Sequence, residues 1–176
     1  MRELGDYLMR IAALAIDLPE NWFEDKFSRQ SSYLLGKYYP APVHAPLAGQ
    51  QRFHAHTDFG ASTILYQDND FGGLEVLQRD GSRLRVPALP GTFIVTLVDM
   101  LANWTNDRGV ATMHRVLNTE EAEAGSDRIS VPIFQHPKLD AMIETIPTCL
   151  KPGKVSRHAP LMWRDRGKHR MSQVTK

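Results

Sequence analysis

Turn residues recur at short intervals through the middle of the sequence, and this spacing constrains the fold more than any other feature. Asn69–Asp70, Gly72–Gly73, Asp80–Gly81 and Pro90–Gly91 separate apolar runs of strand length. Because the runs are short and closely spaced, they predict a sandwich or barrel of strands. The runs fall near residues 33–39, 52–56, 62–66, 74–78, 83–86, 92–98, 112–117 and 128–134. About eight strands suit a double-sheet jelly roll, so we predict an all-β core of that kind.

Two segments of this plan can be described further. The run TFIVTLV at residues 92–98 is the most apolar of the expected strands, so we expect it at the centre of a sheet. Ahead of the strands, apolar residues recur at helical spacing over residues 4–16, and Pro19 lies just beyond them. This pattern predicts an amphipathic helix that flanks the β core.

Composition limits the class of partner. The chain has 176 residues, of which 42% are hydrophobic, and this is enough for one domain with a core. The formal net charge of +1 favours neither nucleic acid nor anionic lipid, and no apolar run is long enough to span a membrane. A small molecule is therefore the expected ligand. Cys149 is the only cysteine, which excludes an internal disulfide and fits a reducing, cytoplasmic setting.

The chain divides into two parts by composition. Residues 1–150 contain the expected helix and strands and form the predicted domain. Residues 151–176 carry many Lys, Arg and His residues and few apolar ones. We expect this segment to be a basic C-terminal tail with a solvated surface. His158 and His169 lie in it, and metal binding there is not expected without nearby partners.

Three residues have the chemistry of a metal site. His56 and Asp58 stand two apart in HTDFG, so on a strand their side chains share a face. His114, in TMHRV, follows several strands later, which is enough chain to return across a barrel. Two imidazoles and one carboxylate can take one face of a divalent metal and leave the other face open. The alternative is that the first two residues form a surface pair and that His114 is a core histidine.

Four longer blocks decide between these alternatives. In order along the chain they read HTDFGASTILYQDNDFGGLEV, DGSRLRVPALPGTFIVTLVDML, WTNDRGVATMHRVLN and RISVPIF. In these blocks the chain resembles the Fe(II)/2-oxoglutarate-dependent dioxygenase superfamily, and within it the isopenicillin N synthase-like group. The resemblance runs from about Leu8 to Pro147. It implies a double-stranded β-helix, a jelly-roll variant, with flanking helices.

The resemblance also implies roles for individual residues. The two histidines and the aspartate described above match the family's iron ligands. Arg128 and Ser130 match the block that binds the cosubstrate 2-oxoglutarate, and Tyr39 in KYYP takes the place of a tyrosine that can touch it. The planar fork of Arg128 can pair with a carboxylate, and Ser130 shares its strand face. A surface salt bridge is the alternative for Arg128.

The expected function is that of a non-haem iron oxidoreductase. Such an enzyme couples 2-oxoglutarate decarboxylation and O2 activation to hydroxylation, desaturation or ring closure of a small organic substrate. Two alternatives stay open: an Fe(II) oxidase of the same fold that does not use 2-oxoglutarate, and an inactive metal-binding fragment. A zinc hydrolase is less well supported, because no general base accompanies the three residues.

Residues beside these blocks have other expected roles. His54 could be a fourth ligand or a proton donor, but we expect it to line the barrel. Trp104 could form a wall of the substrate site, but we expect it to pack in the core. Arg115 directly follows His114 and should therefore point away from the metal.

The chain also departs from the family pattern. Val98 stands where the family often has Gly, and Lys37 stands where it often has Asn. Residues 119–127, TEEAEAGSD, are expected to be an exposed polar insertion. Relatives carry a covering region before the first helix, and we expect this region to be absent here. We therefore expect an uncovered apolar face that favours self-association, and turnover that yields succinate with little oxidised product.

Overall fold

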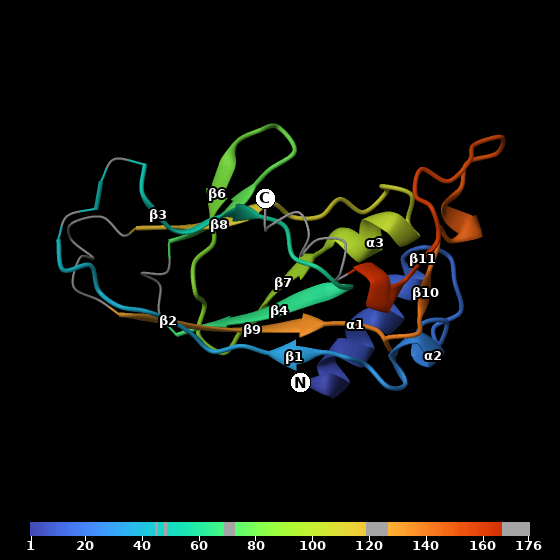
Figure 1. The fold of residues 1–176 in the computed structure, drawn as a ribbon, viewed down its shortest axis with the longest axis horizontal. Coiled ribbons are helices and arrows are strands. Elements are labelled where there is room, and N and C mark those ends of the chain that lie inside the picture. The colour runs from blue at the N-terminus through green and yellow to red at the C-terminus, as the bar shows by residue number, and fades with distance from the viewer. Residues whose placement is uncertain (45, 48, 69–72, 119–126, 167–176) are drawn as a thin grey trace.

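Two antiparallel sheets form the body of the computed structural model, which describes residues 1–44, 46–47, 49–68, 73–118 and 127–166. The larger sheet contains β1 (Tyr33–Leu34), β2 (Lys37–Tyr39), β4 (Ser62–Gln67), β7 (Ile94–Leu97) and β9 (Arg128–Gln135). The smaller contains β3 (Gln51–His56), β5 (Leu74–Leu77), β6 (Arg83–Arg85) and β8 (His114–Leu117). Helices and the short pair β10 (Met142–Ile143) and β11 (Leu161–Met162) gather at one end (Figure 1).

The arrangement of the strands confirms the predicted jelly-roll core. The strand order is β1-β9-β4-β7 in the larger sheet, where β2 also pairs with β9, and β3-β8-β5-β6 in the smaller one. Side chains from both sheets line one pocket, so the two sheets face each other. Each strand expected from the turn spacing is present. The segment 33–39 divides into β1 and β2, and between them the Leu35 N–H donates to the Pro132 carbonyl at 3.0 Å.

The apolar run at 92–98 forms an edge strand, which corrects the expectation that it lies at the centre of a sheet. Among the described strands β7 pairs with β4 alone, whereas β4 and β9 are paired on both sides. Val95 and Leu97 are 42% and 43% exposed. The run is therefore apolar on both faces, but the described chain covers only one of them.

Further apolar side chains lie beside Val95 on the outside of the larger sheet. The register places Val95 opposite Ile64 of β4, and Tyr66 of β4 opposite Val131 of β9. Because side chains two apart on a strand share a face, Tyr66, Val95, Leu97 and Ile129 all lie on this outer side, although Ile64 between them is buried. We call four of its exposed residues the outer apolar face: Tyr66, Val95, Leu97 and Ile129.

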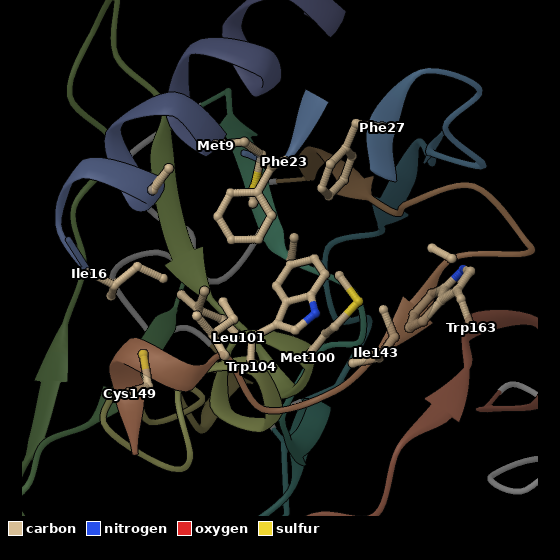
Figure 2. Packing of buried hydrophobic residues seen from close by; sticks show 14 residues of the cluster. Met9, Ile16, Phe23, Phe27, Met100, Leu101, Trp104, Ile143, Cys149 and Trp163 are labelled. Atoms are coloured by element: carbon tan, nitrogen blue, oxygen red, sulfur yellow. The ribbon is translucent and has the colours of Figure 1, made fainter. Parts of the chain in front are cut away.

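The largest hydrophobic cluster lies at the helical end, around Trp104 (Figure 2). The helices there are α1 (Arg2–Leu14), α2 (Glu24–Phe27), α3 (Asp99–Trp104) and the 3₁₀ turn η2 (Pro147–Cys149). The Trp104 ring is fully buried, and its centroid lies 4.7 Å from that of Phe23 and 6.3 Å from that of Phe27. Core packing of Trp104 is thus confirmed.

The first helix is present as expected; of the apolar residues that predict it, Ile16 is buried and Ala12 packs against the core, but Ile11 is exposed. The core contacts come from Met9 and Ala13 on α1 and from Ile16 just beyond it, whereas Ile11 is 62% exposed. The buried side of the helix passes through Gly5, where an added Cβ would press on the Gln135 side chain. No helix in the described part of the chain is long and apolar enough to cross a membrane.

Part of the C-terminal segment packs on the domain, so the expectation of a solvated tail is wrong for Leu161–Trp163. β11 pairs with β10, and the Trp163 side chain is only 8% exposed within the hydrophobic cluster. His158 Nε2 contacts Asp107 Oδ1 at 2.9 Å. His169 lies outside the described residues, as do residues 119–126 of the expected polar insertion.

His136 is a buried titratable group where β9 meets the loop after β3. Its ring lies 5.2 Å from the Tyr33 ring and 4.7 Å from the Trp163 ring, between centroids. Gly60 has a φ of +92°, and a Cβ there would overlap the His136 ring. Burial lowers the pKa of His136 to about 4, although the Phe59 backbone and Asp58 act to raise it.

Mild acid should therefore destabilise the fold through His136. Between pH 6.5 and about 4 the unfolded imidazole binds a proton that the folded one does not, so stability falls as the pH falls. In metal-free protein, the free energy of unfolding of the parent should fall when the pH drops from 7.5 to 5. For His136→Gln this fall should be smaller by about 2 kcal/mol. Urea denaturation at the two pH values measures this difference.

A matched variant, His44→Gln, changes an exposed histidine and should lose as much stability as the parent. Equal losses in the parent and in His136→Gln would contradict the assignment of this acid sensitivity to His136.

Candidate metal centre and adjoining pocket

The pairing of β3 with β8 places two histidines side by side. His56 ends β3 and lies directly opposite His114, the first residue of β8. Their ring centroids are 4.2 Å apart. The register shifts between Phe53 and His56, so β3 is irregular just before the site. Asp58 follows two residues later, beyond the end of the strand, and faces both rings.

Three side chains converge here on one point. His56 Nε2 lies 3.4 Å from Asp58 Oδ1, and His114 Nε2 lies 3.7 Å from the same oxygen. One candidate ligand atom from each residue lies within 4.8 Å of the others. Within the described residues this is the one group of His, Cys, Asp or Glu side chains with such geometry. The prediction that these three residues lie close together is thus confirmed.

Backbone carbonyls fix which nitrogen of each imidazole faces the cluster. His56 Nδ1 lies 2.7 Å from the carbonyl oxygen of His54, and His114 Nδ1 lies 3.0 Å from that of Thr112. Because a carbonyl only accepts, each Nδ1 carries the proton and donates it. In the neutral imidazole each Nε2 then has a lone pair that faces Asp58 Oδ1. Hydrogen bonds of this kind orient the ligands of metal sites.

A threonine hydroxyl orients the carboxylate in the same way. Thr63 Oγ1 donates to Asp58 Oδ2 at 2.7 Å, which leaves Oδ1 for the cluster. Burial acts to raise the pKa of Asp58, but His56, His114 and Thr63 together lower it below its ordinary value. Burial also lowers the pKa of His114. A carboxylate beside neutral imidazoles is the protonation state in which these groups bind a metal.

A buried guanidinium lies at the other end of the same pocket. Arg128 is the first residue of β9 and is 1% exposed, which excludes the surface salt bridge. Its Nη2 donates to Gln67 Oε1 at 2.8 Å. Its Nε and Nη1 are buried and have no hydrogen-bond partner among the described residues. Since burying a charged donor without a partner is costly, these two atoms are suited to an anionic ligand.

The pairing of β2 with β9 brings further polar side chains to this end. Tyr39 lies opposite Arg128, and Lys37 lies opposite Ser130. The Arg128 Cζ atom is 4.8 Å from the centroid of the Tyr39 ring. Ser130 is 2% exposed and lines the pocket with Arg128. The three expected cosubstrate residues are therefore together.

One pocket joins the two ends. Its polar lining includes the two histidines and the aspartate of the cluster, and also Lys37, Tyr39, Arg128 and Ser130. Its apolar walls come from both sheets: Leu65, Leu74, Val76, Val116, Pro132 and Phe134. A ligand in this pocket can thus contact the cluster and Arg128 at once.

Sequence reasoning misplaced one residue near the site and placed another correctly. The His54 side chain is exposed and is absent from the pocket lining, so it is neither a ligand nor part of the barrel wall. Its contribution is the carbonyl that orients His56. Arg115 points away as expected, and its Nη2 pairs with Glu75 Oε2 at 2.8 Å.

Two supporting residues were missed altogether. Thr63 orients Asp58, and Gln67 orients Arg128. Both lie on β4 at alternate positions, with Leu65 of the pocket wall between them. Alternation along β4 was the available signal, because positions 63, 65 and 67 share one strand face.

The residues present fit a divalent metal and a dicarboxylate. Two imidazole lone pairs and one carboxylate oxygen form a three-ligand donor set of the facial-triad type. Nε and Nη1 of Arg128, which have no partner among the described residues, can each donate to an oxygen of an anionic ligand.

Comparison with known proteins identifies the family. Residues 30–137, more than half of the chain, match the model of the 2OG-Fe(II) oxygenase superfamily. The 2-oxoglutarate-Fe(II) type oxidoreductase ppzC of Metarhizium majus is 39% identical over 74% of this chain and 36% of that protein. The rice homoarginine-6-hydroxylase 2-ODD-233 is 30% identical over 99% of this chain and 52% of that protein.

Solved structures agree with this match. A 2OG-Fe(II) oxygenase family protein from Caulobacter crescentus superposes with a TM-score of 0.88 at 28% identity, covering 98% of this chain and 55% of that one. The dioxygenase for auxin oxidation 1 from Arabidopsis thaliana, in a binary complex with 2-oxoglutarate, gives a TM-score of 0.71 at 28% identity, covering 85% and 53%. The chain spans about a third to a half of the length of the curated relatives named above. It belongs to the 2OG-Fe(II) oxygenase superfamily, whose metal is Fe(II) and whose cosubstrate is 2-oxoglutarate.

Proposed function

We propose that this chain is the catalytic part of an oxygenase that uses Fe(II), 2-oxoglutarate and O2 to oxidise a small organic molecule. The observation that carries the proposal is a single pocket with a three-ligand donor set at one end and a buried, incompletely paired arginine at the other. A ligand that chelates a metal and ends in a second carboxylate matches both ends.

In this proposal His56, Asp58 and His114 hold the iron. They occupy one side of it and leave the other side to ligands that enter the pocket. When bound, iron with 2-oxoglutarate supplies the activation of O2, with loss of CO2 and formation of succinate. The hydrogen bond from Thr63 favours the ionised carboxylate of Asp58. Backbone carbonyls orient both imidazoles.

Arg128, Ser130 and Tyr39 hold the distal carboxylate of 2-oxoglutarate. Arg128 provides two charge-assisted donors, and Gln67 fixes its orientation. The Tyr39 ring lies against the guanidinium, with Cζ 4.8 Å from the ring centroid, and helps to exclude water from it. The Ser130 hydroxyl, on the same strand face as Arg128, can donate one further hydrogen bond.

An Fe(II) oxidase that does not consume 2-oxoglutarate is less well supported. The Metarhizium relative is named for 2-oxoglutarate, and the Arabidopsis structure contains this molecule. Two relatives are named as hydroxylases, for homoarginine and for proline. These names favour hydroxylation over desaturation or ring closure as the outcome here.

We further propose that residues 1–150 act as one catalytic unit to which Leu161–Trp163 are attached. The buried free thiol of Cys149 supports a reducing compartment, so we propose a cytoplasmic location. The outer apolar face supports self-association, with a second copy of the chain as its partner.

The first prediction separates the two ends of the pocket. Asp58→Ala removes one of three metal ligands and should sharply lower iron binding. Arg128→Met should leave iron binding unchanged but lower the affinity for 2-oxoglutarate by tens-fold or more. Truncating one side of a buried charge pair costs about 2–5 kcal/mol of binding free energy. Anaerobic titrations of Fe(II) and then of 2-oxoglutarate measure both effects.

Arg115→Met is the matched control, since this arginine pairs with Glu75 outside the pocket. It should bind both ligands like the parent. The assignment of the two ends fails if Arg128→Met binds 2-oxoglutarate as tightly as the Arg115 control does.

A second prediction concerns the residue that orients Asp58. Thr63→Val keeps the side-chain shape but removes the hydroxyl that donates to Asp58 Oδ2. Metal affinity should fall about 10–100-fold, as it does when such supporting hydrogen bonds are lost. Competition titration with Mn(II) measures the affinity, and Thr63→Ser should keep most of it. Parent-like affinity in Thr63→Val would give this hydrogen bond no role in the metal site.

A third prediction concerns the outer apolar face. Val95→Lys adds a charge to this face and should shift the chain toward the monomer. Leu84→Lys, a change at an exposed leucine on the smaller sheet, should not shift it. Light scattering after gel filtration measures the mass. A parent chain that is monomeric at its highest soluble concentration would contradict the proposal.

A further inference from the structure

Lys37 is a second cation in the pocket, and the proposed function gives it no role. It lies on β2 opposite Ser130 and lines the same pocket as the metal cluster and Arg128. Because Lys37 and Tyr39 are two apart on one strand, they share the face that borders the pocket. The lysine therefore contributes to the binding site rather than to the outer surface.

An aromatic ring holds its ammonium group at the metal end. Lys37 Nζ lies 4.0 Å from the centroid of the Phe53 ring. The Phe53 ring in turn meets the His56 ring edge-on, with centroids 4.6 Å apart. Tyr39 holds Arg128 in the same manner at the other end of the pocket. Two cations are thus held by two separate rings, one beside the metal cluster and one at the distal end.

No anion in the described part of the chain pairs with Lys37. Its Nζ has no hydrogen bond or ion pair there, and its side chain is half-buried. Burial lowers the pKa of Lys37 more than the attraction of Asp58 raises it. A partly buried ammonium without a carboxylate costs stability, which a cation–π contact offsets only in part. This arrangement is typical of a group that awaits an anionic ligand.

The charges in the pocket indicate how much negative charge it can take. Lys37 and Arg128 each contribute one positive charge, and Asp58 contributes one negative charge. Bound Fe(II) would add two positive charges, and 2-oxoglutarate would bring two negative ones. With both bound, the pocket would keep positive charge in excess, so another carboxylate would be favoured over a neutral group.

We propose that Lys37 binds a carboxylate at the metal end of the pocket. This inference rests on the proposed function and concerns specificity within that site. The carboxylate belongs either to 2-oxoglutarate, as its 1-carboxylate, or to the molecule that is oxidised. Both sources use the same chemistry, a charge-assisted hydrogen bond from Nζ to a carboxylate oxygen.

Two binding experiments on Mn(II)-loaded protein distinguish the sources. In the first, calorimetry measures the affinities for 2-oxoglutarate and for 2-oxopentanoate. The second compound lacks the distal carboxylate, so its binding does not depend on Arg128. In the second, protein saturated with 2-oxoglutarate is titrated with acetate, hexanoate, benzoate and phenylacetate, each beside its neutral amide. Each experiment compares the parent with Lys37→Met and Lys37→Arg.

Lys37→Met should lower the affinity for the ligand whose carboxylate Lys37 binds by about tenfold or more, since a hydrogen bond to a charged group is lost. Lys37→Arg should recover much of that affinity. A loss of affinity for both 2-oxopentanoate and 2-oxoglutarate identifies the 1-carboxylate of 2-oxoglutarate as the ligand of Lys37. A loss for a monocarboxylate, with no change for its amide, identifies an anionic substrate. Parent-like affinity of Lys37→Met in both experiments overturns the proposal.

Unfolding temperature provides a readout that is independent of ligands. Lys37→Met should be at least as stable as the parent without ligands, because the substitution removes a partly buried charge. A clearly lower unfolding temperature with unchanged binding would make Lys37 a structural residue and overturn the proposal. Failure of the parent to bind Mn(II) or 2-oxoglutarate would instead contradict the proposed function itself.

Discussion

The antiparallel pairing of β3 with β8 is the constraint on which the rest of the site depends. It sets His56 directly opposite His114, so two residues far apart in sequence present their Nε2 atoms to one point. Asp58 reaches that point because the chain leaves β3 immediately after His56, and Gly60 then lets the backbone pass against His136. A change of register by one residue would turn one histidine to the other face and separate the donors.

Stability and binding are placed in different parts of the fold. The hydrophobic cluster around Trp104 lies at the helical end, whereas the space between the sheets is a pocket that contains charged and polar groups. Within that pocket, Tyr39 and Phe53 each hold a cation in place at one end. Because the core does not depend on the pocket residues, substitutions there can change ligand binding while the fold remains.

Sequence periodicity predicted the strands and the flanking helix, because each depends on local spacing. Spacing alone left two interpretations of His56, Asp58 and His114 open, and the resemblance of the four blocks selected the metal site. Periodicity did not predict which strand is central, because strand order depends on pairing between distant segments; the run at 92–98 lies at an edge. The exposure of Ile11 on α1 and the burial of Trp163 were missed for the same reason. Thr63 and Gln67 escaped notice because their partners lie on other segments of the chain.

The central claim is that one pocket places a metal at His56, Asp58 and His114 and the distal carboxylate of its chelator at Arg128. Crystals of the chain soaked anaerobically with Fe(II) and 2-oxoglutarate test it, with data collected at the iron absorption edge. We predict one anomalous peak per chain among the two Nε2 atoms and Asp58 Oδ1, with ligand density that reaches the Arg128 guanidinium. An iron peak elsewhere, or 2-oxoglutarate density away from Arg128, would contradict the account.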